Sequence, residues 1–218
     1  MKNVLTFSVL IIKADCRGPV GSYPFRYLCG MKKVAVFASG SGSNAENLVQ
    51  QLIHSPFARI VAVYSNKPDA YVLERIKPLG VPGHVIKTHD LTDGSLLAKL
   101  ANEGIDMIVL AGFLKLVPDA FIKGFNGPII NLHPSLLPSY GGKGMHGMHV
   151  HQAVIAAGEK QSGITIHHVN EHYDEGTIIR QFTTRLDPDE TPESLAAKIH
   201  ALEMQHLPEV VELIAQTI

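Results

Sequence analysis

Apolar residues fall into short continuous runs that alternate with helical patterns from residue 34 onward. Runs of this kind are typical of strands that are buried on both faces of a parallel sheet, and they cover residues 34–38, 60–64, 107–111 and 128–133. A shorter candidate strand covers residues 84–86. The segments with helical character between these strands are 45–53, 71–77 and 96–103. Strands that alternate with helices predict an α/β fold with a doubly wound, mostly parallel sheet and right-handed crossovers.

The pattern changes after Pro138, where glycines and then histidines accumulate. Residues 163–169 and 177–182 have the character of strands, and a polar loop separates them. The helical patterns of this part cover residues 151–157, 193–206 and 208–218. Two strands joined by a polar loop predict an antiparallel extension of the sheet. We expect residues 31–218 to form a single domain.

The charge balance limits the classes of partner. The chain of 218 residues has 19 lysines and arginines against 20 aspartates and glutamates, so no global basic field indicates a nucleic acid and no polybasic segment indicates a membrane. The only cysteines are Cys16 and Cys29, which excludes a disulfide framework or a cysteine-based zinc site after Met31. Recognition of a partner must therefore be local. Met31-Lys32-Lys33 leads directly into a strand, as the start of a cytoplasmic protein would, and we expect a cytoplasmic protein.

The first thirty residues differ from the rest. Lys2 and the apolar stretch up to Ile12 resemble the start of a signal peptide, but Lys13 and Asp15 interrupt it and no clear cleavage site follows. The apolar stretch is also too short to span a bilayer. We expect Met31 to be the natural start, with residues 1–30 either disordered or a misassigned upstream stretch.

Two polar side chains end the apolar strand at 128–133. Asn131 and His133 share one face of this strand because side chains alternate, and Pro134 and Pro138 prevent a helical continuation. A carboxamide and an imidazole side by side can stabilise the oxyanion that forms when a nucleophile attacks a formyl carbon. The alternative for the isolated pair is an asparagine that bonds the local backbone next to a packed histidine.

A glycine-rich turn links the first strand to the first helix. Its sequence is Ser39-Gly40-Ser41-Gly42-Ser43-Asn44, and backbone N–H groups of such a turn at a helix N-terminus suit a phosphate. The spacing differs from the dinucleotide pattern G-x-G-x-x-G, which favours a mononucleotide-like phosphate. A tight turn that needs glycine only for its backbone angles is the alternative.

Three further groups have candidate roles. Asp174, in the polar loop, is the best candidate for a proton acceptor near His133, although an aspartate before glycine is also a common turn residue. Residues 113–117 can flank a flat heterocycle or belong to an ordinary core. The histidines that suggest a metal are His133, His146, His149, His151, His167, His168 and His172. No H-E-x-x-H helix is present and formyl transfer needs no metal, so we expect none.

Residues 31–218 resemble the phosphoribosylglycinamide formyltransferase family, the folate-dependent enzymes of purine biosynthesis. The motifs that carry the resemblance are residues 39–44, Ser65-Asn66-Lys67, Leu110-Ala111-Gly112-Phe113, Asn131-Leu132-His133-Pro134-Ser135-Leu136-Leu137-Pro138 and Asp174-Glu175-Gly176. The resemblance implies a Rossmann-like formyltransferase fold. It also implies transfer of the formyl group of 10-formyltetrahydrofolate to the amine of glycinamide ribonucleotide, by direct attack through an oxyanion-stabilised tetrahedral intermediate.

The resemblance also implies which residues form the site. The catalytic set corresponds to Asn131, His133 and Asp174, and the contacts to substrate phosphate and glycinamide correspond to Gly42, Ser43, Asn44 and Glu203. The formyl-folate pocket corresponds to Leu114, Lys115, Leu116, Val117, Asn131, Asn170, Glu171, His172, Tyr173 and Asp174. His149 and His167 match family histidines near the site. The chain departs from the family in a longer glycine-rich stretch at 141–148 and in the lack of a matching basic residue at 88–96.

Other functions compete with this interpretation. A formyltetrahydrofolate deformylase usually carries an N-terminal regulatory domain, for which residues 1–30 are too short, and a tRNA formyltransferase carries a C-terminal domain and a basic surface. A non-catalytic nucleotide- or phosphate-binding protein could have the same sheet. The combination of Asn131, His133 and Asp174 favours an enzyme. The oligomeric state, monomer or homodimer, stays open.

Overall fold

The computed structural model describes residues 30–218. The expectations for the N-terminal stretch and for Cys16 and Cys29 concern residues that lie outside this part. The strands are β1 (Lys32–Phe37), β2 (Ala58–Ser65), β3 (Gly83–Val85), β4 (Met107–Leu110), β5 (Ile129–His133), β6 (Gln161–His168) and β7 (Ile178–Arg185). The α-helices are α1 (Ser43–Leu52), α2 (Tyr71–Arg75), α3 (Ser95–Glu103), α4 (Asp119–Gly124), α5 (Met148–Ala156) and α6 (Pro192–Ala215). Short 3-10 helices η2 (Lys77–Leu79) and η3 (His89–Leu91) complete the order.

All strands belong to one mixed sheet with the order β3-β2-β1-β4-β5-β6-β7. The pairs from β3 through β5 are parallel, whereas β6 pairs with β5 and β7 pairs with β6 in antiparallel orientation. The prediction of a doubly wound, mostly parallel sheet with an antiparallel extension is therefore confirmed. The strand order reverses between β1 and β4, which places the ends of β1, β4 and β5 at a common ligand-binding edge.

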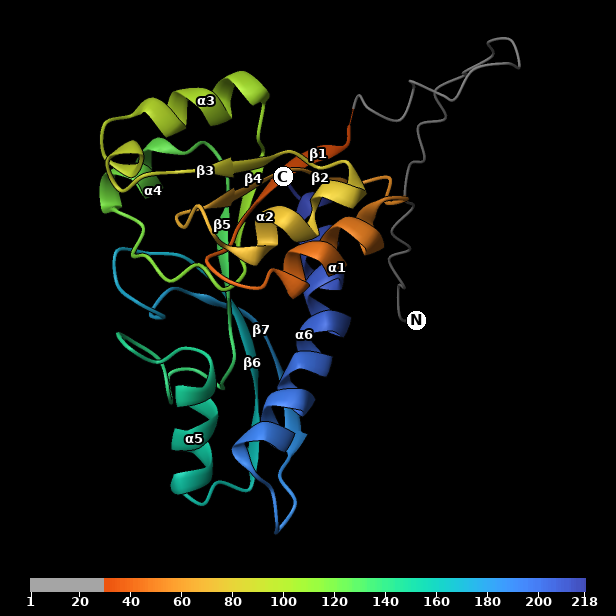
Figure 1. The fold of residues 1–218 in the computed structure, drawn as a ribbon, viewed down its shortest axis with the longest axis vertical. Coiled ribbons are helices and arrows are strands. Elements are labelled where there is room, and N and C mark those ends of the chain that lie inside the picture. Colours follow the sequence, from red (N-terminus) through yellow and green to blue (C-terminus); the bar gives the residue numbers. More distant parts are fainter. Residues whose placement is uncertain (1–29) are drawn as a thin grey trace, which may run out of the picture.

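Helices cover both faces of the parallel part (Figure 1). One hydrophobic cluster joins alternate residues of the central strands, such as Val34 and Val36, to buried residues of α1, α5 and α6. The opposite cluster joins Ala35 and Phe37 to buried residues of α3 and α4. The alternation within β1 shows why this run is apolar throughout, since both of its faces meet a core. Within residues 30–218, no helix combines the length and the apolar character needed to cross a bilayer.

Three local details differ from the sequence-based expectation. Helix α5 begins at Met148 rather than at residue 151. Helix α6 runs without a break through Pro208, although proline removes a backbone donor from a helix interior. The buried neighbours Leu207 and Val211 pack into the core and hold the helix together there. Helix α4 was not predicted because its six residues are too few for a periodic pattern.

The hydroxyl of Ser39 connects three segments that are far apart in the sequence. Its oxygen donates to Asn66 Oδ1 at 2.5 Å and accepts from the Leu114 N–H at 2.9 Å. The Ser39 N–H also donates to the Gly112 carbonyl at 2.9 Å. Ser39 is almost fully buried, with 2% of its surface exposed. The ends of β1, β2 and β4 are therefore fixed relative to one another by a single side chain and its own backbone.

Replacement of Ser39 by alanine tests this connection. The variant leaves the Leu114 N–H without its partner, so we expect a loss of about 1 to 3 kcal/mol in the free energy of unfolding. Urea denaturation measures the difference. Ser41→Ala is the matched control, because Ser41 lies two residues further along the same turn and is exposed. A Ser39→Ala variant as stable as this control would show that the hydroxyl does not hold the segments together.

Candidate active site

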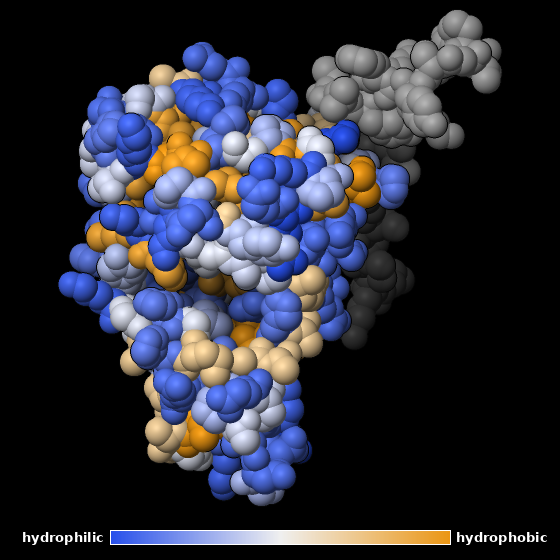
Figure 2. All heavy atoms as spheres, in the orientation of Figure 1, coloured by the Kyte–Doolittle hydropathy of each residue, from blue (hydrophilic) through white to orange (hydrophobic). Residues whose placement is uncertain are grey.

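A cavity of about 680 Å³ opens at the carboxyl ends of β1, β4 and β5. Figure 2 shows the hollow near the middle of the face that is in view. Its wall is formed by residues 40–44, 111–114, 131–134, 142–147 and 173–174, with further side chains from α5 and α6. The volume is in the range of sites for small organic ligands.

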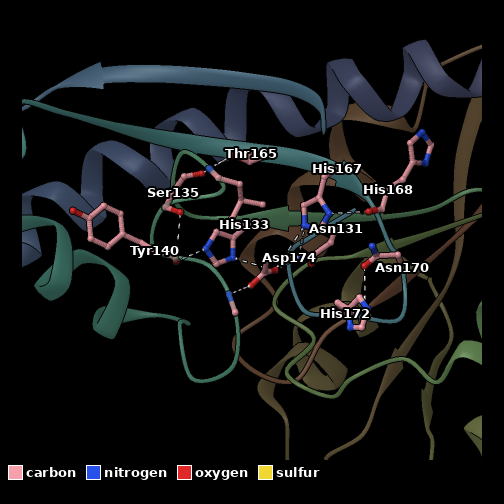
Figure 3. Close-up of polar contacts among 12 residues, drawn as sticks. Asn131, His133, Ser135, Tyr140, Thr165, His167, His168, Asn170, His172 and Asp174 are labelled. Atoms are coloured by element: carbon pink, nitrogen blue, oxygen red, sulfur yellow. Dashed lines mark hydrogen bonds and ion pairs between the residues drawn. The ribbon is translucent and has the colours of Figure 1, made fainter. Parts of the chain in front are cut away.

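Two side chains at the end of β5, those of Asn131 and His133, line this cavity. His133 is buried, with its Nε2 2.8 Å from the Tyr140 carbonyl oxygen and its Nδ1 3.4 Å from Asp174 Oδ1 (Figure 3). An imidazole between two oxygen acceptors satisfies both of them only when both ring nitrogens carry a proton. The geometry therefore suits a charged imidazolium that is paired with the carboxylate of Asp174.

Thr165, directly opposite His133 in the antiparallel pair, fixes the segment after β5. Its hydroxyl donates to the Ser135 carbonyl at 2.6 Å and accepts from the Leu137 N–H at 3.0 Å. Thr165 is fully buried, so these bonds are shielded from water. The polar residue in this strand thus holds the turn that brings Tyr140 to the ring of His133.

The carboxylate of Asp174 lies between the rings of His133 and His167 (Figure 3). Its Oδ1 accepts from Asn131 Nδ2 at 3.2 Å, and its Oδ2 accepts from the Gly142 N–H at 2.8 Å. Burial alone would raise the pKa of this carboxyl, but the hydrogen bonds from His133, His167 and Gly142 hold the pKa well below its usual range. Asp174 is therefore an ionised carboxylate at neutral pH.

The two residues that hold the ring of His133 both have unusual backbone angles. Within residues 30–218, the non-glycine residues with positive φ are Tyr140, at 57°, and Asp174, at 59°. This region costs free energy for a residue with a side chain, and it persists only where the surroundings impose it. The coincidence at both partners of His133 indicates that the arrangement of the ring is imposed by the fold.

The glycine-rich turn forms the opposite side of the cavity. Gly42 precedes α1 with φ of 76°, and a Cβ there would lie only 2.3 Å from Val72 Cγ2, so both the angle and the close packing require glycine. No side chain caps α1. Its first backbone N–H groups, including those of Ser43 and Asn44, are therefore available to an anion, which the helix dipole also favours.

Glu203, on α6, meets the glycine-rich turn across the cavity. Its carboxylate accepts from Asn44 Nδ2 at 2.9 Å and lies 3.5 Å from His200 Nδ1. The bond to Glu203 raises the pKa of His200, while burial lowers the pKa of His151. Asn44 Oδ1 and His151 Nδ1 are buried and have no hydrogen-bond partner within residues 30–218.

The structure brings some of the predicted site residues together and leaves others apart. Those that line the cavity are Gly42, Ser43, Asn44, Leu114, Asn131, His133, Tyr173, Asp174 and Glu203. His167 contacts Asn131 and Asp174 from behind. The predicted residues that are not part of the cavity wall are Lys115, Leu116, Val117, His149, Asn170, Glu171 and His172. Val117 packs into the core with 2% exposure, and the ring of His149 packs against His146.

The cavity wall also contains residues that the sequence did not assign to substrate binding, of which His151 was considered only as a possible metal ligand. Lys143, His151 and His200 line it. His200 precedes Glu203 by one helical turn, a spacing that places both on one face of α6 and that could have identified it. Nothing in the local pattern distinguishes His151 from the other histidines near it.

The histidines around the cavity do not converge as metal ligands. Within residues 30–218, the one cluster with suitable ligand distances is His89, Asp90 and Asp93, at η3 and the turn after it. None of these residues lines the cavity.

Comparison with known proteins identifies the family. The family model described as formyl transferase matches residues 32–211. A chloroplastic phosphoribosylglycinamide formyltransferase from Arabidopsis thaliana is 38% identical over 192 residues, which are 85% of this chain and 66% of that protein. The chain thus spans just under two thirds of the plant relative's length. The phosphoribosylglycinamide formyltransferase of Bacillus subtilis is 35% identical, and the match covers 84% of this chain and 94% of that protein.

Solved structures agree with the sequence matches. Glycinamide ribonucleotide transformylase 1 from Symbiobacterium toebii superposes with a TM-score of 0.77 at 31% identity, covering 87% of this chain and 90% of that one. The phosphoribosylglycinamide formyltransferase of Anaplasma phagocytophilum gives a TM-score of 0.76 at 35% identity, covering 85% of this chain and 87% of that one.

Replacement of Asp174 by asparagine tests the electrostatic part of this geometry. Because folding lowers the pKa of Asp174, its ionised form stabilises the protein above the unfolded-state pKa, about 3.9, and this contribution is lost as the pH falls further. We expect the difference in unfolding free energy between wild type and Asp174→Asn to shrink as the pH falls below about 4.

Urea denaturation above and below this pH measures the difference. The matched control is Asp189→Asn, which alters an exposed side chain that does not line the cavity. A difference for Asp174→Asn that does not change with pH would contradict the ion pairs drawn here.

Proposed function

Because this chain belongs to the formyl transferase family, we propose that it transfers the formyl group of 10-formyltetrahydrofolate to the amine of glycinamide ribonucleotide, a step of purine biosynthesis. The relatives from Arabidopsis thaliana and Bacillus subtilis carry the name of this activity. The observation that carries the proposal is the convergence of Asn131 Nδ2 and His133 Nδ1 on one point, at which Asp174 Oδ1 now lies.

During the reaction the oxygen of the formyl group under attack takes the place of Asp174 Oδ1 next to Asn131 Nδ2 and His133 Nδ1, while the carboxylate turns toward the attacking amine. When the amine nitrogen bonds to the formyl carbon, the carbonyl oxygen becomes an oxyanion that needs donors from fixed positions. Asn131 and a protonated His133 supply two such donors. The distances of 3.2 and 3.4 Å to Asp174 Oδ1 are long for hydrogen bonds, as is usual for catalytic contacts before the substrates bind.

Asp174 serves the proton transfers of the same step. The attacking amine becomes positively charged as the new C–N bond forms, and its extra proton passes to Asp174 directly or through water. The oxyanion then collapses, the bond between the formyl carbon and the folate nitrogen breaks, and this nitrogen takes up a proton. Before it takes up the proton of the amine, the ionised carboxylate of Asp174 orients the ring of His133.

The formyl acceptor occupies the side of the cavity next to α1 and α6. Its phosphate is bound by the N–H groups at Gly42, Ser43 and Asn44, at the uncapped start of α1. Glu203 accepts hydrogen bonds from the glycinamide portion, since its carboxylate already faces the cavity next to Asn44. Holding both substrates in one cavity also supplies a large entropic part of the rate enhancement.

The formyl donor occupies the side next to β4 and the loop before β7. Leu114 and Tyr173 are partly exposed apolar side chains in the cavity wall, as a flat heterocycle requires. The neighbouring Lys115 and Asn170 do not belong to the cavity wall. The predicted cytoplasmic location stays a prediction, since the Arabidopsis thaliana relative is named as chloroplastic.

A spectrophotometric assay of 10-formyltetrahydrofolate consumption tests the function. We expect consumption only when glycinamide ribonucleotide is present, with formation of the formylated product. Consumption without the acceptor would indicate a deformylase. Binding of the nucleotide without any consumption would indicate a non-catalytic phosphate-binding protein.

Asn131→Ala tests the oxyanion donor. The loss of one such donor is expected to lower kcat by about 100- to 1000-fold while the KM values of both substrates stay close to those of the wild type. Asn102→Ala, on the exposed surface of α3, is the matched control. Near-normal turnover of Asn131→Ala would remove this residue from the mechanism.

Glu203→Gln tests the acceptor side of the cavity. The variant keeps the shape of the side chain but loses its charge, so we expect the KM of glycinamide ribonucleotide to rise about tenfold. The KM of the formyl donor should not change. A higher KM for the formyl donor instead would show that Glu203 lies in the donor half of the cavity and not in the acceptor half.

A further inference from the structure

The charged groups in the cavity wall are unevenly partnered. Among the described residues 30–218, Lys143 is the only lysine or arginine in this wall, and Asp174 and Glu203 are its only carboxylates. Both carboxylates already bind neighbouring side chains, Asp174 next to His133 and Glu203 next to Asn44. Lys143 is exposed, and within the described chain its ammonium group forms no hydrogen bond or salt bridge. The wall therefore offers one permanent positive charge with no counter-ion.

Lys143 lies in a hydrogen-bonded turn that fixes the backbone from which its side chain extends. The Met145 N–H donates to the Gly142 carbonyl at 3.1 Å, which places Lys143 and Gly144 at the two central positions of a four-residue turn. Gly144 has φ of 89°, as the third position of a type II turn requires. The Gly142 N–H, at the start of the turn, binds Asp174 Oδ2 at 2.8 Å. Lys143 is thus anchored through its neighbour to the proton acceptor of the site.

Arg75, which binds the glycine-rich turn, cannot supply the charge that this turn lacks. Its Nε donates to the Ser41 carbonyl at 2.8 Å, and its guanidinium pairs with Glu46 at 2.5 Å. Arg75 does not line the cavity. The N–H groups at Gly42 to Asn44 are neutral donors, whereas a phosphate monoester carries close to two negative charges at neutral pH. His200 also lines the cavity, but its Nδ1 lies 3.5 Å from Glu203 Oε2 and is partnered there. A phosphate held only by the neutral donors would be incompletely neutralised.

We propose that Lys143 binds the phosphate of the formyl acceptor and closes the phosphate site opposite the glycine-rich turn. Lysine suits this role because its charge sits on a flexible four-carbon stem and binds phosphate as a point charge. The reacting carbonyl is already assigned two donors, Asn131 and His133, in the function proposed above. The longer glycine-rich stretch of this chain, residues 141–148, thus contributes to substrate binding. This proposal rests on the function proposed above.

Steady-state kinetics with two acceptors tests this proposal. The acceptors are glycinamide ribonucleotide and the corresponding glycinamide riboside, which lacks the phosphate. For Lys143→Met we expect kcat/KM for the ribonucleotide to fall about 10- to 100-fold, mainly through KM, because a hydrogen bond to a charged group is lost. The variant should not change kcat/KM for the riboside. Lys143→Arg should recover most of the loss, because arginine keeps the charge.

The control variant is Lys160→Met, an exposed lysine beyond the end of α5 that does not line this cavity. It should behave as the wild type with both acceptors. An equal loss for both acceptors in Lys143→Met would overturn the proposal, because it would place Lys143 at the reacting carbonyl or in folding. An unchanged KM for the ribonucleotide would overturn it as well. A wild-type enzyme that formylates neither acceptor would instead refute the proposed function.

Discussion

An ionised carboxylate that is withdrawn from water costs several kcal/mol unless donors surround it, and Asp174 has only 10% of its side chain exposed. Its donors come from separate parts of the chain: Asn131 and His133 at the end of β5, His167 near the end of β6, and the backbone of Gly142 in the loop after β5. Each of these groups must be in place before the others are satisfied. The buried charge therefore defines the positions of the strand end and of both loops.

The same constraint prepares the site for chemistry. Asn131 and His133 point at a common oxygen atom of Asp174, so their dipole and charge are already oriented toward one point without any substrate. Donors that need no reorientation during the reaction stabilise a developing oxyanion more effectively than mobile ones. This orientation requires positive φ angles at Tyr140 and Asp174, which cost free energy. The packing of the sheet, with Thr165 buried opposite His133, offsets that cost.

The sheet was predictable from the sequence because its central strands are apolar on both faces and the helices α1 and α3 between strands are long enough to show their period. Asn131 and His133 could also be placed on one face of a strand end, since Pro134 restricts the backbone there. The partners of these residues were less accessible. Asp174 was identified largely by resemblance, because the contact depends on how the loop before β7 folds back over β5, and no local pattern encodes that path.

Long-range contacts also explain why some site residues had no assignment from sequence. Ser39 belongs to a glycine-rich turn whose sequence does not reveal its role, yet its hydroxyl joins the ends of β2 and β4 to β1. His200 lies on the cavity only because α6 packs against α1.

The antiparallel half of the sheet gives the site its chemistry, whereas the parallel half gives it its binding surface. Strands β1 and β4 end in backbone-rich segments, residues 40–44 and 111–114, which suit phosphate and heterocycle. Reversal of direction at β6 pairs Asn131 with His167, so the loop between β6 and β7 returns over the end of β5 and brings Asp174 to it. A parallel strand in that place would need a long crossover before the chain could return. The reversal is therefore the feature that places an acid next to the amide and the imidazole.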